Sequence, residues 1–483
     1  MLFHSLEFII FFPVVVAIYF LAPLRFRQFF LLLASYYFYM CWKAEYAVLI
    51  LLSTGIDYVA ALRMHKTSGR GLSKMWLGFS LAANLGMLFF FKYANFFSAS
   101  ARALLQQANI FCEFPLFDIL LPVGISFYTF QTLSYTIDVY RGEKTPERNF
   151  IKFALYVTFF PQLVAGPIER STRLLPQFDH EHKFDANRVV SGLRLMLWGF
   201  FKKLVIADRL ALYVNEVYNN PADYTGLPVI LATYFFAFQI YCDFSAYSDI
   251  AIGAARVLGF DLMKNFRQPY LAQSIGEFWK RWHISLSTWF RDYLYIPLGG
   301  NRVGKLRWYY NLMAVFVISG LWHGANWTFV VWGALHGSYF VLSLLTQKLR
   351  AHWVQVLRLN AHPRFHTVLK MAITFHLVLL AWIFFRANSL TEALLLLQQI
   401  FRLELTAEHL MSANIALNLG DFAIAFASLG GLLLFDLLDS KGRMGPRLLT
   451  LARPLRWAVY YSLILAVVLF GVYQHIEFIY FQF

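Results

Sequence analysis

Residues 309–345 read YYNLMAVFVISGLWHGANWTFVVWGALHGSYFVLSLL, and this stretch decides the class of fold. It is apolar enough on either side of the run WHGANW (322–327) to form two membrane-spanning segments, 309–322 and 327–345. His323 lies inside that run. A titratable imidazole in an apolar, membrane-embedded stretch is energetically expensive, so it normally marks a transport pathway or a reaction site.

The composition of the whole chain agrees with a polytopic membrane protein. Of the 483 residues, 59% are hydrophobic and 14% are charged, whereas a soluble globular protein carries roughly 25% charged residues. Aromatic residues make up 19% of the chain, which suits lipid-facing helices and interfacial belts. The formal charge of +15 does not indicate nucleic-acid binding, because the basic residues cluster in short loops between apolar segments. Such loops are typical of the cytoplasmic side and favour anionic lipid headgroups.

Hydropathy predicts an all-α membrane protein of about eleven or twelve spans, because crossing a bilayer core of about 30 Å takes ~20 apolar residues. The candidate spans are 8–22, 28–43, 47–64, 76–96, 120–140, 189–212, 227–258, 309–322, 327–345, 367–386, 422–438 and 457–480. The apolar piece 153–164 is shorter and is predicted to be re-entrant or tilted, with its backbone shielded by protein or by a water-filled cavity.

The chain shows no internal repeat and no soluble domain. We therefore expect one integral membrane domain over 1–483, with peripheral helices at about 1–115, a core at about 116–390 and C-terminal helices at about 391–483. No Lys or Arg precedes the first apolar segment, 8–21, so that segment is predicted to be a retained helix and not a signal peptide.

Loop charge predicts the orientation of the chain. Four stretches rich in Lys and Arg are predicted to be cytoplasmic: 65–74, 141–152, 348–364 and 441–456. Three stretches poorer in basic residues are predicted to lie outside: 97–119, 213–226 and 402–421. These assignments alternate consistently and put both termini outside.

Residues 261–308 do not fit a plain series of spans. They carry eight Lys or Arg residues interleaved with aromatic residues, a pattern typical of the membrane–water interface. We predict interfacial or half-inserted helices there, on the cytoplasmic side. Cys41, Cys112 and Cys242 all lie in or beside apolar segments and indicate neither a disulfide framework nor a zinc site.

His323 is the first candidate for chemistry. Burial disfavours the charged form of an imidazole, so a buried neutral histidine can accept a proton from a hydroxyl near neutral pH, as a general base does. Gly320 and Gly324 would let another backbone or a ligand come close, and Asn326 could orient the ring. A histidine hydrogen-bonded to a neighbouring helix explains the position equally well.

His336 lies thirteen residues beyond His323, in the run WGALHG. On one continuous helix that separation is about 20 Å of rise, so the two rings could not touch. We therefore predict that the chain breaks near 324–326. A packing role for His336 is the alternative.

The run GEFWKRWHISLSTWFRDYLYIPLGGNR (276–302) is dense in charge among aromatic residues. An interfacial amphipathic surface explains most of it. Lys280, Arg281 and Arg291 are also able to bind the phosphates of a carrier or coenzyme, which makes them, with Asp292, candidates for a donor entrance. The turn at 298–302 lacks the Gly-Lys-Ser/Thr ending of a phosphate-binding P-loop.

Asp243 and Asp249 lie in the apolar run YCDFSAYSDIAIG (241–253). Their six-residue spacing puts them on different helix faces, so they do not form an acid/base pair. We predict that they hold helices together, with a cavity-lining role as the alternative.

In the run QLVAGPIER (162–170), Gly166 and Pro167 predict a break in the chain. Glu169 and Arg170 could form a pair there, although a plain loop explains the run as well. No group of residues has metal-ligand spacing, so no metal is predicted.

Taken together, these runs resemble the membrane-bound O-acyltransferase (MBOAT) family, in the branch of the bacterial alginate O-acetylation membrane subunit. The resemblance rests on 276–302 followed by SGLWHGANWTFVVWGALHG, and on YCDFSAYSDIAIG, LPVGISFYTFQTLSYTIDVYRG, LVAGPIER and GFFKKLVIADRL. The matching runs lie between about 120 and 340, and the residues after 390 are less distinctive.

The resemblance implies a many-helix core with a central tunnel through the bacterial inner membrane. His323 would be the catalytic histidine and His336 a second functional one, while His283 lies in the RWHISLS motif with a less settled role. Acetyl-CoA or another cytoplasmic acyl thioester would be the donor substrate, with no bound cofactor. The acetyl group would cross to the outer face and pass to a periplasmic partner enzyme or directly to a polysaccharide such as alginate, peptidoglycan or cellulose.

Two other functions stay open at this point. The teichoic-acid D-alanylation branch is a more distant relative and implies an acyl carrier protein as donor. A transporter that moves an acyl or lipid-linked group without chemistry would also place polar residues in its spans. The acidic residues of the predicted outer face do not suit direct binding of an anionic polymer, which favours a protein relay.

Overall fold

The computed structural model is helical, with no β-strand among the residues that it describes. Those residues are 1–67, 69–111, 116–117, 120–402, 417–439, 450–474 and 476–479. They form two compact units, one of Met1–Met196 with Tyr247–Lys264 and the other of Leu197–Ala246 with Asn265–Phe483. The single membrane domain and its three subdivisions stay a prediction.

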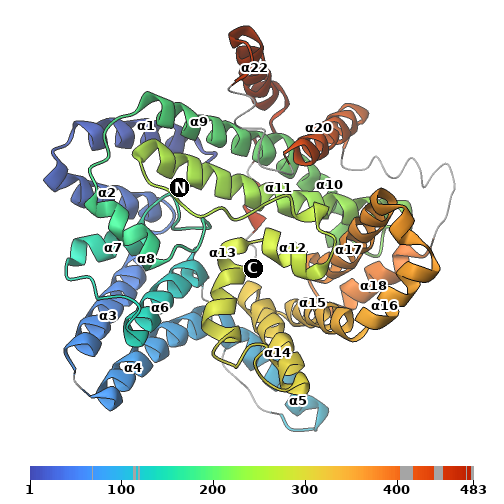
Figure 1. Cartoon of the computed structure of the whole chain (residues 1–483), viewed down its shortest axis with the longest axis horizontal. Helices are drawn as coiled ribbons and strands as arrows, with labels where there is room; N and C mark the ends of the chain where they lie inside the picture. The colour runs from blue at the N-terminus through green and yellow to red at the C-terminus, as the bar shows by residue number, and fades with distance from the viewer. Residues whose placement is uncertain are drawn as a thin grey trace. The chain divides into compact units, whose positions relative to one another are not determined.

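The first unit holds the N-terminal helices, which are blue in Figure 1. Its elements are α1 (Leu6–Leu21), α2 (Leu24–Met40), η1 (Ala44–Tyr46), α3 (Ala47–Lys66), α4 (Arg70–Leu88), η2 (Phe89–Tyr93), α5 (Ala94–Gln107), α6 (Ile125–Arg141), α7 (Phe150–Thr158), α8 (Ser171–Leu174), η3 (Leu175–Asp179), α9 (Ala186–Phe200) and the last part of α11 (Leu227–Leu258). By their residue ranges, α9 and α11 contribute residues to both units.

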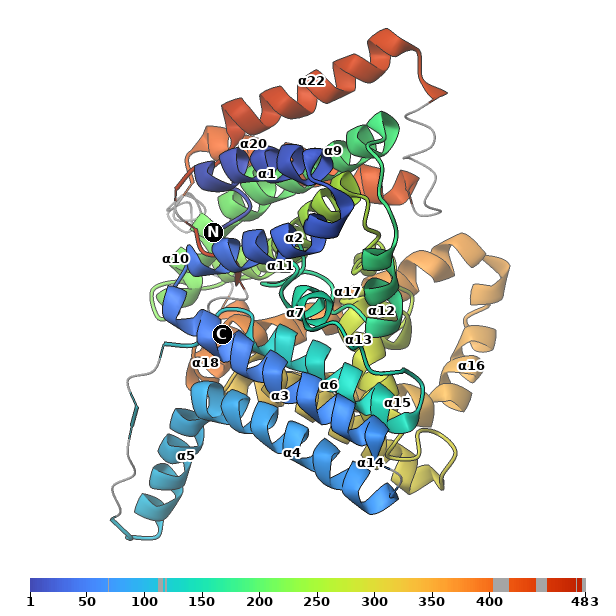
Figure 2. The same ribbon diagram turned by 90° about the vertical axis from the view of Figure 1, so that its left-hand side faces the viewer.

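Helices α3, α4 and α6 lie side by side in the first unit (Figure 2). A buried polar cluster joins α3 to α4: the Asp57 carboxylate accepts hydrogen bonds from Ser80 Oγ at 2.5 Å and from Asn84 Nδ2 at 2.9 Å. Ser53 Oγ in turn donates to Asn84 Oδ1 at 2.6 Å. Lipid offers a polar side chain no partner, so such bonds hold neighbouring membrane helices together.

The apolar piece 153–164 includes a helix that is too short to cross a bilayer, and its re-entrant or tilted path stays a prediction. Helix α7 has nine residues, and the irregular chain that follows it to residue 168 is buried. Side chains satisfy part of this buried backbone, because Gln131 and Gln162 both donate to the carbonyl of Tyr156, at 2.6 and 2.8 Å. Gly124 has a φ of 78°, and a Cβ there would lie 2.9 Å from the Leu163 carbonyl oxygen, so only glycine fits this close approach.

The second unit contains the remaining elements. They are η4 (Phe201–Ala207), α10 (Asp208–Asn219), the first part of α11, η5 (Pro269–Leu271), α12 (Ile275–Arg281), α13 (Ile284–Phe290), η6 (Arg291–Tyr295), α14 (Lys305–His323), α15 (Trp327–Leu345), α16 (Gln347–Val356), η7 (Leu359–Ala361), α17 (Pro363–Arg386), α18 (Leu390–Ile400), α20 (Leu419–Leu438) and α22 (Arg453–Phe470). The short helices predicted within 261–308 are present as η5, α12, α13 and η6. Their interfacial position stays a prediction.

Helices α14 and α15 form a closely packed hairpin, and the predicted chain break between them is confirmed. Helix α14 ends at His323, and Asn326 begins α15 by accepting a hydrogen bond from the backbone N–H of Thr328 at 3.0 Å. Glycines bring the two backbones together: a Cβ at Gly320 would lie 2.2 Å from the carbonyl oxygen of Phe329. Small residues allow this close contact between membrane helices.

Seven helices in the described part of the chain are long and apolar enough to cross a membrane. They run over Ala44–Lys66, Arg70–Gln107, Leu227–Leu258, Trp327–Leu345, Pro363–Arg386, Leu419–Leu438 and Arg453–Phe470. The other predicted spans coincide with α1, α2, α6, the run from α9 to α10, and α14, which are shorter or more polar. The chain is thus a multi-pass membrane protein, and the count of eleven or twelve spans stays a prediction.

Several stretches assigned as loops from their charge contain helix: α10 extends over 213–219, and α4 begins at Arg70 within 65–74. Helix α5 occupies much of 97–119 and α16 much of 348–364, because loop charge reports the side of the membrane and not the local conformation. Most of the predicted loops 402–421 and 441–456, and Cys112, lie outside the described residues. The orientation itself stays a prediction.

The glycine contact between α14 and α15 leads to a first prediction. In Gly320→Ala the new methyl group meets backbone, which cannot rotate away, so we expect a loss of about 1–3 kcal/mol of stability. The measurement is the thermal unfolding midpoint in detergent. Gly78→Ala in α4 is the matched control, because nothing lies within 4 Å of that Cβ. An unchanged midpoint for Gly320→Ala would contradict the close packing.

Candidate active site

The candidate site is built in the second unit around the end of α14. The ring of His323 is 3% exposed and lies among aromatic side chains, with ring centroids 5.0 Å from Trp322, 5.0 Å from Trp332 and 5.4 Å from Phe385. The imidazole therefore lies in an apolar surrounding, as the sequence suggested. A low dielectric strengthens every polar interaction that the ring makes.

The glycines beside His323 serve the packing of this hairpin. Gly320 faces the backbone of Phe329, and a Cβ at Gly324 would lie 2.1 Å from the Phe329 ring. Of the two predicted uses of these glycines, approach of a backbone or of a ligand, the structure shows contact with the chain itself. Asn326 caps α15 and donates to the carbonyl of Asn388 at 2.9 Å. Its predicted support of the histidine stays a prediction.

His323 and His336 share a neighbour. The ring of Trp332 lies 5.0 Å from the ring of each histidine, so the break after α14 brings both imidazoles to one indole. His336 is fully buried, and its Nδ1 accepts a hydrogen bond from Trp279 Nε1 at 3.3 Å. Because Nδ1 accepts, the proton of the neutral ring lies on Nε2.

The ring of His283 lies 6.5 Å from the ring of His323 between centroids. His283 has a left-handed backbone with φ of 43° and begins α13. Its Nδ1 faces Oδ1 of Asn265 at 3.3 Å, and that oxygen also accepts bonds from the backbone N–H and Oγ of Ser285. The Asn265 oxygen thus requires the proton of His283 on Nδ1, which leaves Nε2 as the basic nitrogen. Burial lowers the pKa of His283 to about 3, so the ring is neutral at physiological pH.

Most charges of the predicted donor entrance are already paired. Arg281 Nη2 lies 2.6 Å from Glu277 Oε1, and Arg291 Nε lies 2.7 Å from Asp292 Oδ1. Lys280 is exposed at the end of α12. The position of a donor entrance at these residues stays a prediction.

Comparison with known proteins identifies the family. The model of the MBOAT, membrane-bound O-acyltransferase family matches residues 147–389, which include the three histidines and α14–α15. The probable alginate O-acetylase of Azotobacter vinelandii is 42% identical over 396 residues, covering 81% of this chain and 76% of that protein. The chain belongs to the membrane-bound O-acyltransferase family.

Other relatives of this acyltransferase are named for different polymers. The peptidoglycan O-acetyltransferase of Helicobacter pylori is 36% identical over 399 residues, 77% of this chain and 73% of that protein. The teichoic acid D-alanyltransferase of Bacillus subtilis is 27% identical over 268 residues, 53% of this chain and 66% of that protein. The chain is thus more similar to the two O-acetylating relatives than to this D-alanylating one.

Asp243 of the acyltransferase is part of a buried ion cluster in the second unit. Lys203 Nζ lies 2.8 Å from Asp208 Oδ1 and 2.9 Å from Asp243 Oδ1, and all three side chains are buried. The second carboxylate oxygen of Asp243 accepts a hydrogen bond from the backbone N–H of Ile479 at 2.8 Å. These contacts agree with the predicted role of Asp243 in holding segments together. Asp249 lies half-buried six residues further along α11.

This cluster gives a second prediction. In Asp243→Asn, Lys203 keeps its ion pair with Asp208 and loses its second charged partner, so we expect a loss of about 1.5–3 kcal/mol, as for other hydrogen bonds to charged groups. The measurement is the yield of monodisperse protein in detergent and its unfolding midpoint. Asp292→Asn is the control, since the exposed Arg291 beside it remains solvated. A stable Asp243→Asn variant would contradict a structural role.

Glu169 in the first unit was expected to pair with Arg170 or to lie in a plain loop. It is fully buried, its Oε1 accepts a hydrogen bond from the backbone N–H of Met263, and its ion pair is with Arg173 Nε at 4.0 Å. Its Oε2 has no hydrogen-bond partner among the described residues. Burial raises the pKa of Glu169 to about 7, only partly offset by the Met263 hydrogen bond and the Arg173 charge.

The raised pKa of Glu169 gives a third prediction. The folded chain holds this proton more tightly than the unfolded chain, so its contribution to stability is full at low pH and falls as the pH rises from about 4.5 through about 7. In Glu169→Gln the side chain stays neutral, so we expect that variant to exceed wild type by roughly 1–3 kcal/mol at pH 8 and to match it near pH 5. Unfolding midpoints between those pH values test this. A wild-type midpoint whose pH dependence survives in Glu169→Gln would contradict it.

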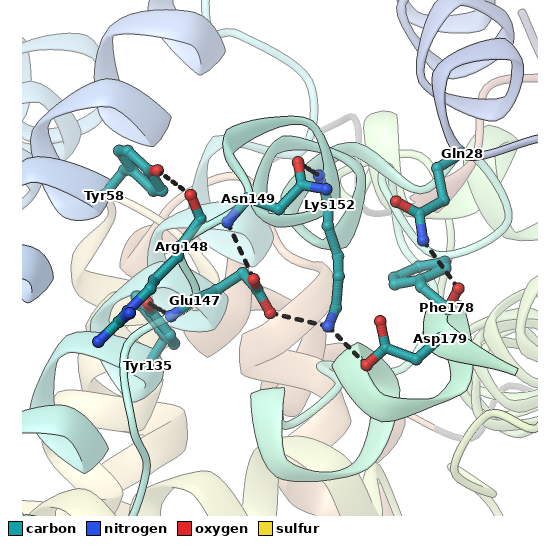
Figure 3. A network of polar contacts seen from close by, with 9 residues as sticks. All are labelled: Gln28, Tyr58, Tyr135, Glu147, Arg148, Asn149, Lys152, Phe178 and Asp179. Atoms are coloured by element: carbon teal, nitrogen blue, oxygen red, sulfur yellow. Dashed lines mark hydrogen bonds and ion pairs between the residues drawn. The ribbon is translucent and has the colours of Figure 1, made fainter. Parts of the chain in front are cut away.

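A second polar network in the first unit uses a basic residue of the predicted loop 141–152. Lys152 Nζ lies 2.8 Å from Glu147 Oε2 and 2.6 Å from Asp179 Oδ2, which joins the start of α7 to η3 (Figure 3). Two carboxylates around one ammonium group raise the pKa of Lys152 despite the opposing effect of burial. The Lys152 charge therefore serves to position the chain.

Sequence reasoning missed several residues of these sites. Trp332, Asn265 and Lys203 were not singled out, although Trp332 lies one helical turn before His336 on α15. That spacing is a usable signal, because residues four apart share a helix face. The meeting of Lys203 with Asp243 has no such signal, since forty residues separate them.

Proposed function

We propose that this acyltransferase moves an acetyl group from a cytoplasmic thioester donor across the bacterial inner membrane for O-acetylation of an extracytoplasmic polysaccharide. The polymer would be of the alginate, peptidoglycan or cellulose type, and a periplasmic enzyme would complete the transfer. Acetyl-CoA would be the donor, and both termini would be periplasmic. The main support for this proposal is His323. This buried histidine lies in the region that the family model matches, contacts the same indole as His336, and lies 6.5 Å from the ring of His283.

The names of the relatives support the acetyl group and the polymer class. Four-fifths of the chain aligns with a probable alginate O-acetylase at 42% identity, and three-quarters aligns with a peptidoglycan O-acetyltransferase at 36%. The similarity to a teichoic acid D-alanyltransferase is weaker and covers about half of the chain. D-alanyl transfer from a carrier protein is therefore the second candidate.

The chemistry of the site supports a role for His323 as general base. A thioester is already activated, so positioning and removal of one proton are the main requirements for acyl transfer to a hydroxyl. A neutral imidazole can take that proton and return it to the leaving thiolate. The aromatic rings around His323 exclude water, which would otherwise compete as the acceptor.

The exposed Lys280 supports a phosphorylated donor, because its ammonium group has no carboxylate partner among the residues that the structure describes and can therefore bind a phosphate. Arg281 and Arg291 would have to exchange their carboxylate partners to do so. Lys280 is therefore the residue at which donor binding should be tested first.

The proposed role of His323 gives a fourth prediction. His323→Ala should lower the rate of polymer acetylation by at least about 10²-fold, because it removes the general base, while the protein stays in the membrane and elutes as a single species. Ester content of the envelope polysaccharide, measured by mass spectrometry, reports activity. His362→Ala is the control, since His362 is exposed just before α17. Normal acetylation by His323→Ala would refute the role.

The donor and the alternatives are separated by one experiment. Membranes that contain the protein are supplied with labelled acetyl-coenzyme A, or with a D-alanyl carrier protein. Transfer or thioester cleavage that depends on His323 and on coenzyme A supports the proposal. Dependence on the carrier protein indicates D-alanyl transfer, and movement of label without cleavage indicates a transporter.

A further inference from the structure

Two buried N–H groups on α15 have no hydrogen-bond partner among the described residues. One is the indole Nε1–H of Trp332, whose side chain is 0% exposed. The other is Nε2 of His336, which carries the proton of the neutral ring because Nδ1 accepts from Trp279. A buried donor without a partner destabilises the folded protein, so two such donors on one helix face require an explanation.

Two neighbouring indoles, those of Trp279 and Trp382, do have hydrogen-bond partners. Trp279 Nε1 donates to His336 Nδ1, and Trp382 Nε1 donates to the hydroxyl of Tyr270 at 3.2 Å. The rings around Trp332 are those of His323, His336 and Phe385, and in the described part of the chain the Trp332 N–H is hydrogen-bonded to neither imidazole. The missing partner is therefore expected to come from a bound molecule.

The position of these donors indicates the chemistry of that molecule. Trp332 and His336 are four residues apart, so they share a face of α15, and their ring centroids are 5.0 Å apart. The Trp332 ring also lies 5.0 Å from the ring of His323. A group held by both N–H donors is thus an acceptor oxygen placed beside the proposed general base.

We propose that Trp332 Nε1–H and His336 Nε2–H form an oxyanion site that binds the carbonyl oxygen of the acyl group during transfer. This inference rests on the proposed function and assigns a role to a residue, Trp332, that the motifs did not single out. It also gives His336 the role of a hydrogen-bond donor and leaves proton transfer to His323.

The acceptor hydroxyl oxygen attacks the thioester carbonyl carbon and gives its proton to His323, while the π electrons of the carbonyl move to its oxygen. Trp332 and His336 donate hydrogen bonds to that oxyanion. When the carbonyl reforms, the carbon–sulfur bond breaks, and the thiolate takes the proton from His323 to leave as a thiol. The product is an oxygen ester.

Such a step is accelerated by hydrogen-bond donors that are already positioned where the oxyanion forms. Charge on the oxygen grows in the transition state, and donors in a dry site stabilise it without any reorganisation. Removal of one donor of this kind typically lowers kcat by about 10²–10³-fold. The ground-state carbonyl is a weaker acceptor, so KM should change little.

The sharpest test replaces Trp332 by β-(3-benzothienyl)alanine, which has the shape of tryptophan and a sulfur in place of the N–H. The probe is labelled acetyl-coenzyme A, supplied to membranes that contain the full chain. We expect kcat to fall by about 10²-fold with KM within about two-fold of wild type. The same replacement at Trp382, which removes the bond to Tyr270, should leave kcat near wild type. An unchanged kcat for the Trp332 isostere would overturn the proposal.

A second comparison keeps the test independent of folding. His336→Gln retains a side-chain N–H donor and His336→Leu does not, so the Gln variant should be at least about ten-fold more active at equal amounts of folded protein. Equal rates for both variants would overturn the role of His336.

Comparison of His323→Ala with the Trp332 isostere distinguishes the oxyanion site from the general base. If His323→Ala is inactive and the Trp332 isostere is fully active, only the oxyanion site is refuted. If His323→Ala is active, the proposed general base is refuted whatever Trp332 does. If wild-type membranes do not use acetyl-coenzyme A, the proposed donor is refuted, and the isostere is then compared with wild type in intact cells by polysaccharide ester content.

Discussion

The candidate site depends on the contact of α14 with α15 at backbone distance. Gly320 meets the carbonyl of Phe329, and a Cβ at Gly333 would lie 2.3 Å from the carbonyl of Phe316. Side chains larger than glycine at these two positions would push the helices apart. The close approach is what allows Trp332, on one helix, to touch His323, at the end of the other. The contact between Trp332 and His323 therefore depends on glycine at positions 320 and 333.

Much of the fold could be predicted from the sequence, because apolar length and turn residues are local signals. The spans, the short piece at α7 and the break between His323 and Asn326 were all visible as patterns. The partners of these residues were not visible. His283 meets Asn265 and Asp243 meets Lys203 only through packing of distant segments, and no periodicity encodes which segments meet. The capping of α15 by Asn326 was likewise not predicted, and its support of the histidine ring stays a prediction.

Two basic side chains of the described structure are held by carboxylates and are not available to a ligand. These two cations inside the units are paired with carboxylates at short distance: Lys203 with two aspartates, and Lys152 with Glu147 and Asp179. From the sequence, Lys152 was interpreted only as part of a basic cytoplasmic loop, and Lys203 was not singled out. Their pairing shows that a basic residue in a membrane protein should be assigned to a ligand only after its own partners are known. Among the proposed donor-binding residues, this criterion favours Lys280.

The end of α14 at His323 places the negative end of the helix dipole beside the imidazole. His323 is the last residue of that helix, and the aligned peptide dipoles give the carboxyl end of a helix a partial negative charge. A proton taken up by the imidazole would appear next to this negative end, in an apolar surrounding where the field is weakly screened. Such an arrangement is typically worth about 0.3–2 kcal/mol for a histidine cation. The helix end thus helps the ring to carry, for a moment, the positive charge that aromatic neighbours alone would resist.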